Sequence, residues 1–340
     1  MATFRIFSKA LSRELRRSSV RMSDGTHTYR PHHSGIVEDA WTKAVASVMN
    51  GNKARVYGIE LEVPTSYGLL TTQLAALDRL RAGRVEDGSL NSGSDIEFRF
   101  PPLSVDAIKR MRLIDRTRKI LGSYTWEPEL DDHNTYGIHI HSNIAWMKEL
   151  TPYIVSYLVR SNSLFFQWVS GRLGYSRYES PASCFYSKMA TCVQLELGTL
   201  EWRIFRSTYN QELVNLWLDL IRAVEDWAEQ QSPSHIYATD VGTDTVMLHT
   251  PPNVLTLESF FQFVLSNKRR YQKVARLVAV WKGLHVYWEW YEDDDGYEDD
   301  DGEDRKRLSS VLEDYLHLIY QTKQPRPKKD TSDASLPLAA

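Results

Sequence analysis

The sequence predicts an α+β fold in which short strands alternate with longer amphipathic helices. Short segments with alternating polar and apolar side chains, such as 55–63 and 136–144, are typical of half-buried strands. Longer segments between them carry apolar residues at helical spacing, as in 210–230. With 42 % hydrophobic and 25 % charged residues, the 340-residue chain has the composition of a globular protein with a large core.

The predicted elements follow one another along the middle of the chain. Strands are predicted at 55–63, 95–100 and 136–144, with two more over 192–206; helices are predicted at 69–80, from Ser104 to about Leu121, from Thr151 to about Leu173, and at 210–230, 256–290 and 306–322. Ser104 suits a helix N-cap, and Gly122 suits the position just after that helix. Pro152 suits a first helical turn, and Pro101-Pro102 is expected to end the second strand.

The two ends of the chain differ from its middle. Residues 1–52 show no sustained period and are predicted to form a disordered or extended arm. A core over 53–231 is expected to precede a helical C-terminal extension over 232–323. Acidic residues dominate 292–304, which predicts a solvated loop because like charges at that density repel. The tail 324–340 is predicted to be disordered.

Charge and cysteine content exclude several classes of protein. The formal net charge of -3 argues against a nucleic-acid or anionic-membrane partner, because such binders are basic. No apolar run reaches the roughly 18 residues that a membrane span needs. Cys184 and Cys192 form no CxxC pair, which favours two free thiols in a reducing, cytoplasmic compartment.

Four predicted strands each carry two ionisable side chains two residues apart. These pairs are Glu60 and Glu62, Glu97 and Arg99, His139 and His141, and Glu201 and Arg203; in the last strand they oppose Leu200, Trp202 and Ile204. Residues i and i+2 of a strand share a face. For one strand, a solvated face is the ordinary interpretation. Four faces without lysine, rich in carboxylates, imidazoles and guanidinium groups, indicate ligands for cations and phosphates.

The last two strands suggest a further carboxylate pair. Gly198-Thr199 suits a two-residue type II′ hairpin, which would pair Glu196 with Glu201. Two carboxylates directly opposite each other repel, so a positive group is expected between them. A divalent cation is one candidate for that group, and Arg203 or Arg206 is the other.

These motifs, in their order, resemble one protein family. YGIELE, EDGSL, a Glu-containing strand followed by PPLS, then GIHIHSN and LEWRIFR are similar to the amidoligase family of the glutamine synthetase and glutamate–cysteine ligase superfamily. The resemblance covers roughly residues 55–230. It implies a glutamine-synthetase-like fold, with a curved, mainly antiparallel sheet lining a funnel and helices packed on its outer face. It also implies ATP and Mg²⁺ or Mn²⁺ as cofactors.

The resemblance also implies roles for individual residues. The metal ligands would be Glu60, Glu62, Glu97, His139 and Glu201, and the hairpin pairing adds Glu196 to this set. His141 would act beside the phosphates, Arg203 would steady the transferred phosphoryl group, and Asp87 is the candidate for taking the proton of the amine. Arg99, Arg206 and Lys188 are the candidates for contacting ATP. Arg99 and the segment 183–188 depart from the pattern of the family.

The activity implied is that of an ATP-dependent carboxylate–amine ligase. ATP would convert a small-molecule or peptide carboxylate into an acyl phosphate, which an amine then attacks to form an amide. Two alternatives stay open. One is a catalytically inactive scaffold with the same fold, and the other is a metal-dependent hydrolase, for which an HxH motif and carboxylates would also serve.

Overall fold

The computed structural model describes thirteen stretches of the chain. These are residues 7–10, 13, 35–51, 53–63, 71–80, 82–85, 96–122, 136–171, 191–194, 197–231, 237–240, 246–249 and 255–289. The chain divides into two compact units, Met1–Gly296 and Tyr297–Ala340, and all the described residues belong to the first. The acidic segment 292–304, the tail 324–340 and the helix predicted at 306–322 lie outside the described residues.

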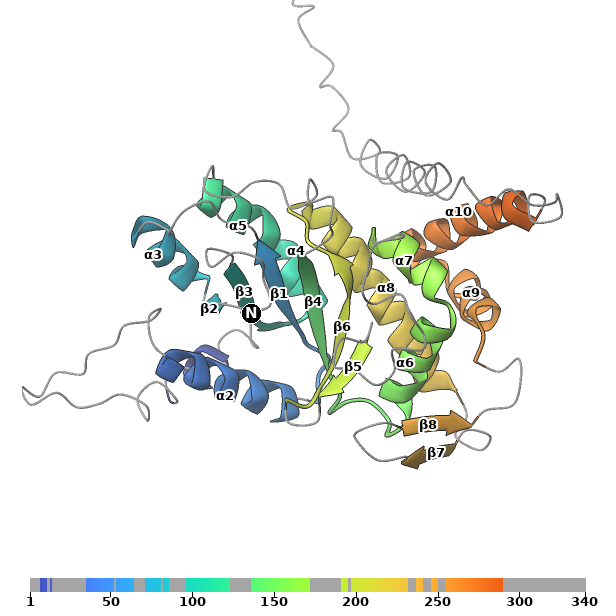
Figure 1. Ribbon diagram of the computed structural model, residues 1–340, viewed down its shortest axis with the longest axis horizontal. Coiled ribbons are helices and arrows are strands. Elements are labelled where there is room, and N and C mark those ends of the chain that lie inside the picture. The colour runs from blue at the N-terminus through green and yellow to red at the C-terminus, as the bar shows by residue number, and fades with distance from the viewer. Residues whose placement is uncertain are drawn as a thin grey trace, which may run out of the picture. The chain divides into compact units, whose positions relative to one another are not determined.

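A six-stranded sheet with the order β2-β3-β1-β4-β6-β5 forms the centre of this unit (Figure 1). Its strands are β1 (Tyr57–Val63), β2 (Gly83–Val85), β3 (Ile96–Leu103), β4 (Gly137–Asn143), β5 (Thr191–Gln194) and β6 (Thr199–Arg206). Every pairing between neighbouring strands is antiparallel. Helices pack around the sheet, so the predicted α+β class with an antiparallel sheet is confirmed.

One face of the sheet is apolar and packs against α8 (Gln211–Gln230). Ile59, Leu61 and Trp202 are fully buried on this face. Phe205 stacks on Trp217 of α8, with ring centroids 4.7 Å apart. Because aromatic rings bury large areas, this contact is a main part of the core.

Two irregularities set which residues face α8. β3 continues through Pro101-Pro102 to Leu103, so the prediction that these prolines end the strand is wrong. The strand tolerates the prolines because β3 has one extra residue opposite Gly58, which forms a bulge. Residues in a bulge do not all donate a backbone hydrogen bond to the neighbouring strand, so a residue without an N–H group fits there. A second extra residue, on β6 opposite His139, lets Phe205 rather than Ile204 continue the apolar face beside Trp202.

The remaining helices largely follow the predicted ranges. They are α3 (Thr71–Arg79), α4 (Val105–Met111), α5 (Leu113–Leu121), α6 (Thr151–Ser161), α7 (Ser163–Ser170), α9 (Leu257–Ser266) and α10 (Gln272–Glu289). Three predicted helices are each divided in two, and the helix predicted at 256–290 becomes α9 and α10. Arg112, with φ 48°, separates α4 from α5, and Asn162 separates α6 from α7. The Asn162 side chain donates to the Leu158 carbonyl at 2.8 Å, a local bond that competes with the helix ladder.

Residues before the sheet form a helix, α2 (Gly35–Gly51), where an arm was predicted. The prediction of a disordered or extended arm over 1–52 is therefore wrong for residues 35–51. Five apolar residues at helical spacing explain the helix, since they form one buried stripe with Phe7 and Val56: Trp41, Ala44, Val45, Val48 and Met49.

The position of α2 adds to the prediction that helices pack on the outer face of the sheet. A Cβ atom on Gly58 would lie 3.2 Å from Met49 Cε, and one on Gly83 would lie 3.2 Å from the Trp41 ring. Gly58 pairs with His141, and Gly83 pairs with Arg99, so both glycines lie on the polar face. Helix α2 therefore covers part of that face, opposite α8 (Figure 1).

The hairpin between β5 and β6 has a different register from the predicted one. Gln194 pairs with Thr199, and Cys192 pairs with Glu201, so a longer loop replaces the two-residue turn at Gly198-Thr199. Gly198 has φ +66°, a conformation that glycine adopts without strain, but it ends the loop. The predicted pairing of Glu196 with Glu201 is therefore wrong, and Glu196 itself lies outside the described residues.

The region after α8 contains strands as well as helices. β7 (Tyr237–Asp240) and β8 (Val246–His249) form a separate two-stranded antiparallel sheet. The helical extension predicted over 232–323 therefore begins with two short strands, which contain the strand formers Tyr237, Thr239 and Val246. Among the described residues, no helix has the length and apolar character needed to cross a membrane.

Candidate metal centre

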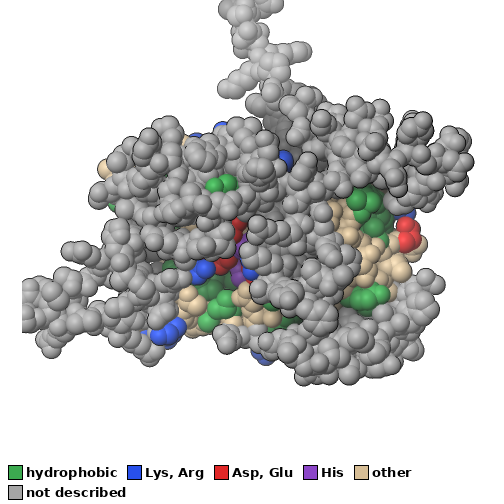
Figure 2. Space-filling view, viewed as in Figure 1, with side chains coloured by type: hydrophobic (Ala, Val, Ile, Leu, Met, Phe, Trp, Pro, Cys, Tyr) green, Lys and Arg blue, Asp and Glu red, His purple; other side chains and the backbone are tan. Residues whose placement is uncertain are grey.

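Four strands bring the predicted ionisable side chains together on the polar face of the sheet. Glu60 of β1 lies opposite both Arg99 of β3 and His139 of β4. His141 of β4 lies opposite Glu201 of β6. Acidic, histidine and basic side chains accordingly gather near the middle of the face seen in Figure 2. The predicted convergence of these strand faces is confirmed.

The carboxylate and imidazole atoms lie within a few ångströms of one another. His141 Nε2 is 3.4 Å from Glu60 Oε2 and 3.9 Å from Glu201 Oε1. His139 Nδ1 is 3.4 Å from Glu60 Oε2 and 3.5 Å from Glu201 Oε1, and its Nε2 is 3.6 Å from Glu62 Oε1. One donor atom each from Glu60, His141 and Glu201 fit within 4.8 Å of one another. These three residues form the centre of the cluster.

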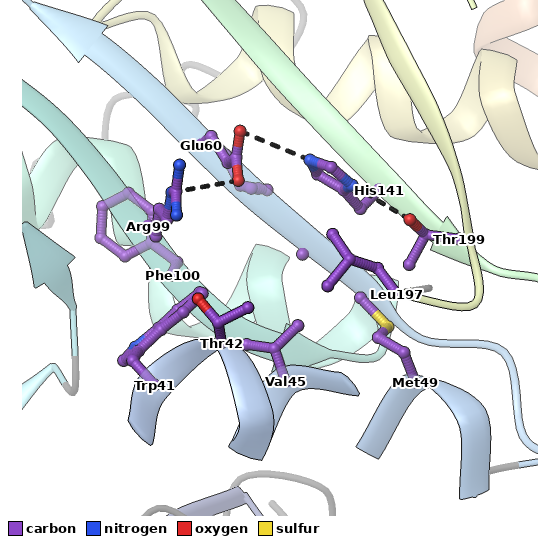
Figure 3. A pocket seen from close by; sticks show the side chains of 12 residues that line it. Trp41, Thr42, Val45, Met49, Glu60, Arg99, Phe100, His141, Leu197 and Thr199 are labelled. Carbon is purple, nitrogen blue, oxygen red and sulfur yellow. Dashed lines mark hydrogen bonds and ion pairs between the residues drawn. The ribbon is translucent and has the colours of Figure 1, made fainter. Parts of the chain in front are cut away.

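Neighbouring groups hold these side chains in place. The His141 Nδ1 atom lies 3.2 Å from the Thr199 hydroxyl, and the other side of the ring faces Glu60 (Figure 3). The Nε2 atom is thus left close to Glu60 and Glu201. The Gly137 N–H donates to Glu62 Oε2 at 2.6 Å, and the Gln194 amide donates to Glu201 Oε2. Such outer contacts fix the orientation of ligand side chains in metal sites.

Two arginines flank the cluster on opposite sides. Arg99 Nε is 3.3 Å from Glu60 Oε1 and also pairs with Glu97. Arg203 Nη1 is 3.3 Å from Glu201 Oε1. The side chains of both arginines are about one-fifth exposed, whereas Glu97 and Glu201 are almost fully buried. The guanidinium groups therefore lie at the solvent side of a buried carboxylate cluster.

Because the cluster is buried, its net charge has a large effect on its stability. Glu62, Glu97, Glu201, His139 and His141 are each at most 6 % exposed. Among the described residues, four carboxylates face two guanidinium groups, so the carboxylates outnumber the arginines that contact them. A buried excess charge is costly unless a counter-charge compensates it. Either protons on the histidines or a divalent cation can supply that charge.

The pKa shifts in the cluster also indicate that positive charge is favoured there. Burial opposes ionisation of Glu60, but His141, His139 and Arg99 outweigh it and hold the pKa of that carboxyl well below its usual range. Burial also opposes protonation of both histidines. Nearby Glu60 and Glu201 outweigh this effect and raise the pKa of His139 and of His141. Burial and the charge of Glu60 raise the pKa of Glu97 to about 7.

A divalent cation fits this set of donors. In an octahedral site with bonds of about 2.1 Å, neighbouring ligand atoms lie about 3 Å apart, close to the separations found here. Carboxylate oxygens suit Mg²⁺, and imidazole nitrogens among them suit Mn²⁺ as well. Glu60, His141 and Glu201 would hold the ion, with His139 and Glu62 next to them.

Some predicted site residues do not join the cluster. Among the described residues, no ion pair links Arg206 to these carboxylates; its side chain packs instead against Gly171 at the end of α7. Arg206 is therefore not the counter-charge of Glu201, and Arg203 is. Asp87, Lys188 and Glu196 lie outside the described residues, so their roles stay predictions.

The structure adds residues that the sequence patterns did not identify. Thr199 and Gln194 reach the cluster because of the hairpin register, which the local sequence did not determine. Trp41, Thr42 and Val45 of α2 line a cavity next to Glu60 and His141. The spacing of the α2 apolar residues was a visible signal for a buried helix, although it did not indicate which surface the helix covers.

Comparison of the chain with known protein families and with characterised proteins finds no match.

Proposed function

We propose that this chain is an ATP-dependent carboxylate–amine ligase that works at a divalent-metal centre on the polar face of the sheet. The observation that carries the proposal is the buried cluster around Glu60, His141 and Glu201, whose donor atoms lie close enough together to hold one ion. The order of the sequence motifs, which is similar to that of amidoligases, supports the choice of reaction.

The residues of the cluster suit phosphoryl transfer to a carboxylate. Mg²⁺ or Mn²⁺ bound there would supply positive charge to neutralise the phosphates of ATP. Arg99 and Arg203 offer planar guanidinium groups beside the carboxylates, and such groups bind phosphoryl oxygens in pairs. Thr199 keeps the imidazole of His141 oriented toward the centre. Asp87 is the candidate base for the attacking amine.

A metal-dependent hydrolase could use the same carboxylates and imidazoles. The two functions can be distinguished by the reaction that the protein catalyses. A ligase releases ADP only when ATP, a carboxylate and an amine are all present. A hydrolase cleaves its substrate without ATP. An inactive scaffold binds the metal weakly or not at all and does neither.

The central test replaces Glu201 by glutamine, which keeps the shape of the side chain and removes its charge. Because Glu201 is buried among the candidate ligands, we expect Glu201→Gln to weaken Mn²⁺ binding at least tenfold and to abolish amine-dependent ADP release. Isothermal titration with Mn²⁺ and an ADP-release assay across a panel of carboxylates and amines measure the two effects.

Glu225→Gln is the matched control for this test. Glu225 is also a fully buried glutamate, but it lies on α8 and bonds to Tyr57 on the other face of the sheet. We expect this variant to bind Mn²⁺ like the wild type. Equal Mn²⁺ affinities for wild type and Glu201→Gln would contradict the metal centre. If the protein binds metal but releases no ADP with any combination of carboxylate and amine, only the proposed ligase activity is contradicted.

A further inference from the structure

A small cavity lies between α2 and the candidate metal centre. Its lining comes from α2, the central strands and the loop before β6, and includes Trp41, Val45, Met49, Glu60, His141 and Leu197. In Figure 3 the α2 side chains point toward the strands, and Glu60, Arg99 and His141 lie on the opposite side of the cavity. Two residues of the metal centre therefore form part of the wall.

Because α2 packs closely against the sheet, the wall of this cavity is part of the protein core. Met49 lies against the backbone at Gly58, and the Trp41 ring lies against Gly83, at distances that leave no room for a Cβ atom without a shift. Trp41, Val45 and Met49 are buried. Their position in the cavity wall is therefore determined by core packing rather than by a loose surface helix.

The two sides of the cavity differ in chemistry. Trp41, Val45 and Met49 of α2, with Leu197, present an apolar surface, whereas Glu60 and His141 present candidate metal-binding atoms. A ligand that fits both sides has an anionic group at the metal centre and an apolar group against α2. Because the cavity volume is only about 40 Å³, the space for a few water molecules, that apolar group has to be short.

We propose that the carboxylate substrate carries a short aliphatic side chain and that α2 selects it through Val45 and Met49. The inference rests on the proposed function, since it assigns the cavity to the substrate that is phosphorylated. The carboxylate would lie near Glu60, His141 and the bound cation. Its side chain would lie against the apolar wall from α2, where a longer or aromatic group meets Val45.

The experiment enlarges the cavity at Val45. In Val45→Ala, removing two methyl groups makes room for a longer side chain. We expect the preference for a carboxylate with one or two more methylene groups over the best short one to rise by at least tenfold, since one methylene in an apolar pocket changes discrimination by 10- to 200-fold. KM and kcat for a graded series of aliphatic and aromatic carboxylates, measured by ADP release, give this preference.

Val48→Ala is the matched control, because Val48 is buried on the same helix and does not line the cavity. It should leave the order of carboxylate preference unchanged. An unchanged preference in folded Val45→Ala would overturn the inference. A change in the KM for ATP alone would also overturn it, because the cavity would then belong to the nucleotide.

Calorimetry separates this inference from the proposed reaction. Titrating the same carboxylates into Mn²⁺-loaded wild type and Val45→Ala requires no turnover. A shift toward longer carboxylates in the variant supports the inference even if no ADP release is found, in which case the ligase proposal alone fails. Absence of any carboxylate binding to either protein would overturn the inference directly.

Discussion

At the scale of single residues, the cluster depends on side chains that are themselves held by neighbours. The imidazole of His141 has one nitrogen near the Thr199 hydroxyl and the other near Glu60 and Glu201. Rotation of this ring would remove Nε2 from the centre. We therefore expect the hydroxyl of Thr199 to affect binding of the proposed metal ion, although it is not a candidate ligand.

Replacing Thr199 by valine tests this dependence, because the two side chains have nearly the same shape. We expect Thr199→Val to weaken Mn²⁺ binding about tenfold, since the contact that orients His141 is lost. Isothermal titration measures the change. Thr191→Val is the matched control, because Thr191 is equally buried on neighbouring β5 and lies opposite Trp202 on the apolar face. Equal affinities for both variants and the wild type would contradict this role of Thr199.

At the scale of elements, local patterns predicted five strands of the central sheet and the polar faces of four of them, but not the short strand β2. The alternation in 55–63 and 136–144 is a property of the strand itself, so it gave the side chains that share a face. The sequence could not give the register of β5 and β6, because Gly198 suits both a two-residue turn and the end of a longer loop. The bulges in β3 and β6 likewise depend on the partner strands.

Helix α2 shows a second limit of local patterns. Its buried stripe from Trp41 to Met49 has helical spacing, but only its fit to glycines from separate parts of the chain determines where it packs. Gly58 and Gly83 are far apart in sequence and meet the same helix. The cavity beside the candidate metal centre therefore could not be predicted from the sequence, whereas most of the candidate ligands could be.

The packing of α2 on β2 can be tested at Gly83. A valine there would push into the Trp41 ring, which already lies 3.2 Å from the position of a Cβ atom. We expect Gly83→Val to lower the free energy of unfolding by about 1–3 kcal/mol, as overpacking does in other cores. Urea unfolding followed by circular dichroism measures the loss.

A double-mutant cycle with Trp41→Leu supplies the control. A smaller side chain at position 41 makes room for the valine, so Gly83→Val should cost less in the Trp41→Leu background than in the wild type. If the changes in the free energy of unfolding caused by the two substitutions are strictly additive, the ring and the glycine do not interact in solution. The described packing of α2 on β2 would then be wrong.

At the scale of the whole molecule, the sheet separates two polar clusters. The second cluster lies on the α8 side, where the Tyr57 hydroxyl donates to Glu225 Oε2 at 2.8 Å. Next to it, Asp226 accepts from Arg55 at 2.6 Å and from Arg270 at 2.7 Å. These bonds join β1, α8 and the segment before α10, so the cluster connects the sheet to the helices behind it.

Glu225 makes this connection sensitive to pH. Burial, which outweighs the opposing effects of Arg55, Ser142 and Tyr57, raises the pKa of Glu225 to about 7 from its ordinary value of 4.5. Between these two values the folded state binds more protons than the unfolded state. The stability contributed by Glu225 is therefore complete below about pH 4.5 and is lost as the pH rises toward 7.

Replacing Glu225 by glutamine removes this titration and keeps an oxygen that accepts from Tyr57. We expect the free energy of unfolding of the wild type, measured relative to Glu225→Gln, to fall by on the order of 3 kcal/mol between about pH 4.5 and pH 7.5. Urea unfolding at several pH values in the presence of a chelator measures the difference, and the subtraction cancels the titration of the metal-site groups. A difference that stays constant or rises over this range would mean that Glu225 is ionised at a normal pKa in the folded protein.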